Sequence, residues 1–149
     1  MKFRPDNKIF TRLYRCFLYR FAGGVVLLLT TTGRRSGRPH TIGLQYELID
    51  GAYWVGAADG PRADWYRNLL VNPQVEIQAG RTRMSATAAV VDDPERVAEY
   101  LAYRLKKRPL MLRLILWLDG NRGRITVQVL RDYAKGIRAV VITPVAAIR

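Results

Sequence analysis

Apolar residues recur at three- and four-residue spacing near the start of the chain. This spacing places them on one face of a helix over about residues 6–22, which Gly23-Gly24 ends. Basic side chains, among them Arg12 and Arg15, lie largely off that face. The helix either packs its apolar stripe on the core of the domain or lies on anionic lipid as a basic amphipathic helix. The stripe consists of Ile9, Phe10, Leu13, Tyr14, Phe17, Leu18 and Phe21.

Three apolar or alternating runs follow, and turn residues bound each of them. They predict strands over Val25–Thr32, Thr41–Ile49 and Ala52–Ala57. Asp50-Gly51, between the last two, is a tight hairpin signal. We therefore expect the sheet to begin as an antiparallel meander.

A short helix and a second hairpin are predicted next. Residues 62–71 have a helical pattern that Asn72-Pro73 stops. Gln74–Gln78 and Thr82–Val91 then read as two strands joined around Ala79-Gly80.

Two helices are expected in the following segment. Asp92-Asp93-Pro94 opens a helix that runs to about Lys107, with the proline in its first turn. Leu110–Leu118 predicts a second, short helix after Pro109. This apolar run is shorter than the roughly 20 residues that a membrane span requires.

The tail predicts two further strands, over about Arg124–Leu130 and Ile137–Thr143. A length of 149 residues is typical of one domain, and 49% apolar residues suffice for a core. No repeat, low-complexity segment or linker divides the chain. We therefore expect residues 1–149 to form a single α+β domain with a mostly antiparallel sheet or small barrel.

Charge narrows the range of partners. The chain has 25 Lys and Arg against 12 Asp and Glu, a formal net charge of +13. Such a surface attracts nucleic acid, an acidic membrane or a phosphorylated small molecule, and charge alone does not choose among them. The first forty residues hold nine basic residues and one acid, so most of the excess lies there.

Cysteine and histidine usage argues against a metal centre. The single thiol, Cys16, forms no internal disulfide, and a reducing cytoplasm is the expected compartment. His40 is the only histidine, which makes histidine-ligated metal chemistry or a Ser-His-Asp triad a poor hypothesis. We predict no metal site.

The segment Thr32-Gly-Arg-Arg-Ser-Gly37 directly follows a predicted strand. Its backbone N–H groups, hydroxyl and two guanidinium groups can converge on one anion, and phosphate fits that description best. An exposed hairpin with arginines for solubility explains the spacing equally well. The pattern is neither a Walker loop nor a Rossmann fingerprint.

The stretch LLLTTTGRRSGRPHTIGLQY (27–46), followed by DWYRNLLVNPQVEIQAGRTRMSATAAVVDDPERVAEYL (64–101), resembles the deazaflavin (F420)-dependent nitroreductase and oxidoreductase family. These proteins are relatives of the flavin-binding split β-barrels, and the resemblance covers about residues 25–105. It implies a mostly antiparallel split β-barrel of six to seven strands with flanking helices. It also implies reduced coenzyme F420 as the hydride donor, with a quinone, enone or nitro compound as acceptor.

The resemblance implies a set of site residues. Arg34, Arg35 and Ser36 match the positions that grip the cofactor phosphate. Tyr46 and Tyr66 are the candidate catalytic residues, which would position the acceptor or donate a hydrogen bond to it. The further positions that match cofactor contacts are Arg38, His40, Leu44, Gly56, Ala57, Ala58, Trp65 and Asn68.

The chain also departs from the family pattern. The loop AADGPRAD is short, and Asp59 stands near a position that is often basic. His40 takes a place often held by arginine, and Gln45 a place where some members carry an aromatic residue. The region after Lys107 does not match, although substrate contacts in such enzymes come partly from there.

Several alternatives remain open from sequence. Split barrels reuse one crevice, so the ligand could be FMN, FAD or another flavin- or tetrapyrrole-like molecule. A non-enzymatic basic protein that binds nucleic acid or a lipid surface also fits the charge. A homodimer and peripheral attachment to the inner face of the membrane are compatible with the pattern.

Overall fold

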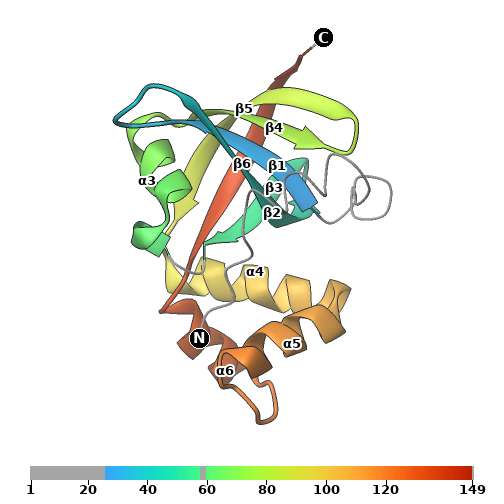
Figure 1. The fold of residues 1–149 in the computed structure, drawn as a ribbon. Coiled ribbons are helices and arrows are strands. Elements are labelled where there is room, and N and C mark those ends of the chain that lie inside the picture. The colour runs from blue at the N-terminus through green and yellow to red at the C-terminus, as the bar shows by residue number, and fades with distance from the viewer. Residues whose placement is uncertain (1–25, 58–59, 149) are drawn as a thin grey trace.

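The structure is a computed structural model that describes residues 26–57 and 60–148. Within these residues six strands close into an antiparallel barrel in the order β1-β2-β3-β6-β5-β4. Three helices, α4, α5 and α6, form a layer beneath the barrel, and α3 lies against its flank (Figure 1). This arrangement confirms the predicted antiparallel barrel with flanking helices. The helix predicted over residues 6–22 lies outside the described residues.

The elements follow the predicted boundaries closely up to Leu118. The strands are β1 (Val26–Thr32), β2 (Pro39–Ile49), β3 (Ala52–Ala57), β4 (Gln74–Ala79), β5 (Thr82–Val91) and β6 (Arg138–Ala147). The helices are η2, a short 3-10 turn (Gly60–Arg62), α3 (Asp64–Val71), α4 (Pro94–Lys107), α5 (Pro109–Leu118) and α6 (Val127–Ala134). None of the helices in the described ranges is long and apolar enough to cross a membrane.

Side chains fill the inside of the barrel. Leu27 and Leu29 on β1 have no exposed surface, and they meet Val55, Ile77 and Ile142 from three other strands. Successive side chains of a strand point to opposite faces, so every second residue of each strand points into the barrel and fills its interior. The barrel interior is therefore one of two hydrophobic cores.

A second core lies between the outer wall of the barrel and the helix layer. Val97 and Leu101 of α4 and Leu112 and Leu116 of α5 are buried there, together with Ala139 on the outward side of β6. Because β6 carries buried residues on both of its faces, it joins the two cores. The helix layer is thus packed on the barrel through apolar contacts.

The strand predicted over Arg124–Leu130 is wrong. That region contains the start of α6, and the Thr126 side chain caps the helix by accepting a hydrogen bond from the Val129 backbone N at 3.2 Å. The alternating apolar residues of the segment resemble a strand. Leu130 and Ala134, four residues apart, are the ones that pack into the second core, and this tertiary contact outweighs the β-branched composition.

The last strand is longer than predicted. β6 was expected to end at Thr143, yet it continues to Ala147. Pro144 interrupts the pattern in the sequence because proline cannot donate a ladder hydrogen bond. The barrel accommodates it at a register shift between Ser85 and Ala86 on β5.

A capping variant tests the start of α4. Asp93 occupies the N-cap, and its carboxylate accepts a hydrogen bond from the Glu95 backbone N at 3.2 Å. We expect Asp93→Ala to lower the free energy of unfolding by about 1 kcal/mol, measured by urea denaturation. The neighbouring exposed residue provides the control, and Asp92→Ala should change stability by less than about 0.5 kcal/mol. Equal losses in both variants would contradict the capping role.

Candidate functional site

The segment Gly33–Arg38 forms a tight turn between β1 and β2. The Gly33 N–H donates to the Arg38 carbonyl at 2.8 Å, and the Gly37 N–H donates to the Gly33 carbonyl at the same distance. Gly37 has φ +67°, a conformation that glycine adopts without strain. The predicted turn is therefore present, and it places Arg34, Arg35 and Ser36 at its tip.

Ser36 and His40 lie together across the base of this turn. The Ser36 hydroxyl is 3.3 Å from His40 Nε2 and accepts a hydrogen bond from the Arg38 backbone N at 3.2 Å. A Cβ atom on Gly33 would lie 2.5 Å from the Ser36 Oγ and 2.8 Å from His40 Nε2. A side chain at position 33 would therefore displace the Ser36 and His40 side chains, both of which are exposed.

Arg34 is held by helix α3. Its guanidinium group donates to Asn68 Oδ1 at 3.0 Å and to Asp64 Oδ1 at 3.1 Å, and its backbone N donates to Asn68 Oδ1 at 3.2 Å. Asn68 is buried, and its Nδ2 donates to the Thr31 hydroxyl at 3.2 Å. Arg34 therefore joins the turn to α3. Asp64 takes part in this contact, although the sequence did not predict it as a site residue.

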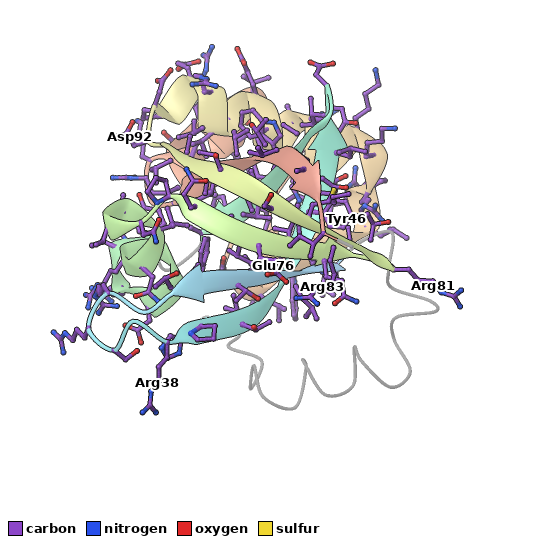
Figure 2. The ribbon with its side chains drawn as sticks, turned by 90° about the horizontal axis from the view of Figure 1, so that it is seen from above. Arg38, Tyr46, Glu76, Arg81, Arg83 and Asp92 are labelled. Carbon is purple, nitrogen blue, oxygen red and sulfur yellow. The ribbon has the colours of Figure 1, made fainter. Side chains whose placement is uncertain are left out.

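Two other arginines of the turn face solvent. Arg35 and Arg38 are exposed, as are Ser36 and His40. Figure 2 shows Arg38 pointing away from the barrel, at the end opposite to Arg81 on the β4–β5 turn. The structure thus brings the predicted phosphate-binding residues together in one turn. Arg34 points toward α3, whereas Arg35 and Arg38 point into solvent.

The two candidate catalytic tyrosines contact the same core. Tyr66 and Trp65 of α3 are buried in the barrel interior with their rings edge to face, 6.1 Å apart. Tyr46 is half-buried, packs against that core, and lies 5.1 Å from the ring of Tyr53. Burial raises the pKa of Tyr66, with Arg138 opposing the shift. Like any tyrosine it is protonated at neutral pH and can donate a hydrogen bond, and burial opposes its ionisation further.

The residues predicted to face the ring system lie on two sides of the barrel wall. Leu44 pairs with Leu27 and packs against the interior, and Ala57 is buried there as well. Gly56 faces outward, where a Cβ atom would lie 4.0 Å from both Tyr100 and Arg104 of α4. Ala58 lies outside the described residues.

A buried ionic cluster beside Gly56 was not foreseen. Glu47 on β2 is 5% exposed and accepts a hydrogen bond from Arg108 Nε at 3.1 Å, and Arg104 Nε lies 4.0 Å from the same oxygen. Arg104 also donates to Gln45 Oε1 at 3.1 Å. A buried carboxylate requires such partners. The sequence signal was the four-residue spacing of the two arginines, one helical turn apart.

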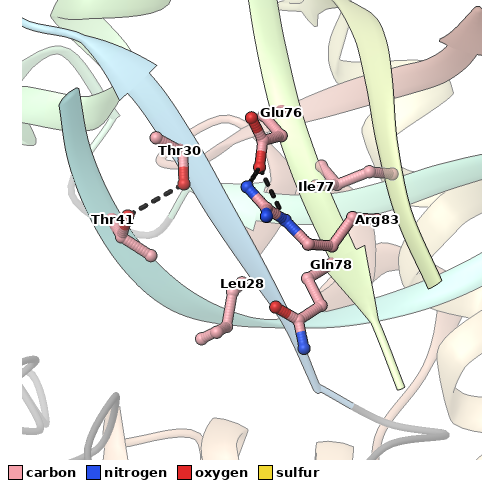
Figure 3. Close-up of a pocket in the computed structure, with 7 residues that line it drawn as sticks. All are labelled: Leu28, Thr30, Thr41, Glu76, Ile77, Gln78 and Arg83. Atoms are coloured by element: carbon pink, nitrogen blue, oxygen red, sulfur yellow. Dashed lines mark hydrogen bonds and ion pairs between the residues drawn. The ribbon is translucent and has the colours of Figure 1, made fainter. Parts of the chain in front are cut away.

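A pocket of about 230 Å³ opens on the outer wall formed by β1, β2, β4 and β5 (Figure 3). It is small for a drug-sized ligand, since such sites usually enclose about 300–1,000 Å³. Of its described lining residues none is aromatic, and Arg83 is paired with Glu76. The lining residues are Leu28, Thr30, Thr41, Glu76, Ile77, Gln78 and Arg83. We therefore place the candidate site at the Gly33–Arg38 turn and α3.

Residues 2–115 match the model of a family described as F420H(2)-dependent quinone reductase. An F420H(2)-dependent quinone reductase of Mycobacterium tuberculosis is 43% identical over 74 residues, which is 46% of this chain and 50% of that protein. The chain thus spans about half the length of the curated relatives it matches. The family match includes the turn, α3 and the ionic cluster.

Solved structures agree on the fold. An F420-H2 dependent reductase superposes with a TM-score of 0.53 at 22% identity, covering 78% of this chain and 92% of that one. A putative pyridoxamine 5'-phosphate oxidase from Listeria innocua gives 0.55 at 15% identity, covering 95% and 94%. At these identities the likeness concerns the fold, and it confirms the predicted split β-barrel.

Removal of the Asn68 amide tests the link between the turn and α3. Asn68→Ala leaves the Thr31 hydroxyl and the Arg34 amide without their partner, so we expect a loss of about 1–3 kcal/mol in unfolding free energy. Hydrogen exchange of the Arg34 backbone amide should accelerate in the same variant. Asn72→Ala, which removes one exposed local hydrogen bond to Gln74, is the matched control and should leave that exchange unchanged.

A pH titration tests the burial of Tyr100. Burial raises its pKa to about 12, and Arg104 partly opposes the shift. The folded protein therefore holds this proton more tightly than the unfolded chain, in which the pKa is about 10. The resulting stabilisation is complete below about pH 10 and is lost as the pH rises through about 12. In Tyr100→Phe, the free energy of unfolding should fall less steeply above pH 10 than in the wild-type protein. Ultraviolet absorbance should also show one fewer tyrosine that ionises late in the titration.

Proposed function

We propose that this chain, which belongs to the F420H(2)-dependent quinone reductase family, is an enzyme that transfers a hydride from reduced coenzyme F420 to a quinone. The observation that carries the proposal is the Gly33–Arg38 turn, which hydrogen bonds of Arg34 join to α3 and which presents arginines to solvent within the segment that matches the family. We also propose that residues 1–149 form one domain, which is supported by β6 joining the two cores of the described residues.

The donor set of the turn suits the tail of the coenzyme. That tail carries a phosphate and carboxylates, and arginine binds such groups through its planar guanidinium fork. Arg35 and Arg38 are exposed and adjacent to the Ser36 hydroxyl, so we assign tail binding to them, with His40 beside them. Arg34 already bonds to Asn68 and Asp64, so its part is to position the turn.

When bound, the reduced deazaflavin supplies the hydride, and the protein supplies orientation and exclusion of water. We propose that the ring packs on the barrel wall at the end of β3, where the Gly56 backbone lies beside the Tyr100 and Arg104 side chains of α4. Leu44, Ala57 and Trp65 support this wall from the interior side. We propose that the region closes around the ring through α3.

Acceptor positioning is assigned to the two tyrosines. Tyr46 is the more accessible, and both are protonated at neutral pH as phenols with an ordinary pKa of about 10 are, with burial raising the pKa of Tyr66 further. Either hydroxyl could donate a hydrogen bond to the oxygen on which negative charge develops. A quinone is the proposed acceptor. We extend the proposal to enones and nitro compounds, because they too have an oxygen on which negative charge develops during reduction. A homodimer and attachment of residues 6–22 to lipid stay predictions.

The binding test uses the exposed arginine of the turn. A charge-assisted hydrogen bond is worth about 1.5–3 kcal/mol, so Arg35→Ala should weaken binding of full-length coenzyme F420 by roughly 10- to 150-fold. Binding of the deazaflavin ring without its tail should barely change. Arg124→Ala removes an equally exposed charge from the α5–α6 loop and should leave both affinities intact, as measured by fluorescence titration.

Three results would count against the assignment. Tighter binding of FMN or FAD than of coenzyme F420 would favour another flavin as the ligand. Equal losses for the full coenzyme and the tail-less ring would remove Arg35 from the tail site. A collapse of DNA affinity in Arg35→Ala, with a salt slope shallower by about one unit, would favour a nucleic-acid binder.

A further inference from the structure

Helix α5 is apolar on two opposite sides. Leu112 and Leu116 are 1% and 0% exposed and pack into the second core. The residues on the other side lie at positions i, i+4, i+7 and i+8, which share one face of a helix. They form the α5 face, which consists of Leu110, Leu114, Trp117 and Leu118, with exposed fractions of 82%, 57%, 49% and 48%.

A helix that is apolar all round is normally buried all round. Single exposed apolar residues are common on protein surfaces, whereas a contiguous row along one helix marks a contact surface. In Figure 1, α5 lies in the helix layer on the side away from the barrel, where none of the other described elements covers its outer side. The α5 face is therefore a candidate for a partner.

Two cationic side chains lie beside this face, within a segment rich in exposed cations. Arg113 lies on α5 itself, and the Arg122 guanidinium group sits 5.2 Å from the centre of the Trp117 ring. The acid within residues 104–124 is Asp119, whose carboxylate already accepts a hydrogen bond from the Tyr133 hydroxyl. The exposed cations of this segment are Lys106, Lys107, Arg113, Arg122 and Arg124. The cationic rim of the α5 face therefore consists of Arg113 and Arg122, within a strongly positive segment.

We propose that the α5 face docks onto the surface of an anionic lipid bilayer. Leucines and a tryptophan suit the boundary between headgroups and acyl chains, and each lysine or arginine near an anionic surface adds about 1 kcal/mol of attraction. A tryptophan ring is favoured at that depth because it is apolar with one polar N–H group.

Charge distinguishes this occupant from a second copy of the chain. In a twofold dimer the same patch lies on both sides of the interface, so the cations around one α5 face would meet the identical cations of the other. Like charges placed opposite each other across an interface are repulsive. A surface of lipid phosphates supplies the complementary charge. This docking does not depend on the proposed reductase activity.

Vesicle sedimentation with the full chain tests the proposal. The protein should pellet with vesicles of phosphatidylglycerol and phosphatidylcholine and much less with phosphatidylcholine alone. Leu110→Gln combined with Leu114→Gln should lower the partition coefficient about tenfold or more. Leu70→Gln combined with Val71→Gln removes two other exposed apolar residues, from α3, and this control should bind as the wild-type protein does.

Fluorescence and charge variants supply independent readouts. Trp117 should shift to shorter emission wavelengths on anionic vesicles, and the shift should vanish in Trp117→Phe. Arg113→Gln should weaken binding and reduce its salt dependence, whereas Arg62→Gln on η2 should not. Circular dichroism should show that each variant is folded, because all these positions are exposed.

The proposal fails under three outcomes. Unchanged binding in the Leu110 and Leu114 double variant would assign membrane affinity to another part of the chain, such as residues 6–22. Equal binding to neutral and anionic vesicles would remove the role of the cationic rim. Sedimentation velocity that shows a dimer in the wild-type protein and a monomer in the double variant would assign the α5 face to a second copy.

Discussion

The side-chain amide of Asn68 joins three parts of the molecule that are distant in sequence. Its nitrogen donates to Thr31 at the end of β1, and its oxygen accepts from both the backbone and the guanidinium group of Arg34. Because the amide is buried, each of these hydrogen bonds replaces one that water can no longer supply. Together with the Arg34–Asp64 ion pair, this residue holds the turn against α3 and so sets the geometry of the candidate site.

This constraint divides the basic motif into two roles. Arg34 points inward and completes the contacts of Asn68 and Asp64, so its charge serves the structure of the turn. Arg35 and Arg38 point outward and remain free to meet an anion in solution. The tight turn makes this possible, since Gly37 has φ +67°, a conformation that glycine adopts without strain.

A second buried polar contact orients the helix layer. Glu47 on the outer wall of β2 binds Arg108, the residue between α4 and α5, and lies close to Arg104. A carboxylate that is buried in this way is stable only when its cationic partners are present, so α4 and the start of α5 are tied to the barrel. With Leu112 and Leu116 directed to the core, the opposite row of α5 must face outward.

The spacing of apolar residues and the turn-forming residues determined most of the secondary structure, because both act within a few residues along the chain. Asp50 and Gly51 both adopt positive φ, as the hairpin signal requires, and β3 and α4 begin and end where the sequence places them. The motifs that resemble the reductase family are equally local. The tertiary structure alone decided that Leu130 would belong to a helix and that Glu47 would be buried, because both outcomes depend on contacts with distant residues. For the same reason, the sequence placed Arg34 and Arg35 side by side, and only the fold could turn one of them toward Asn68, 34 residues away.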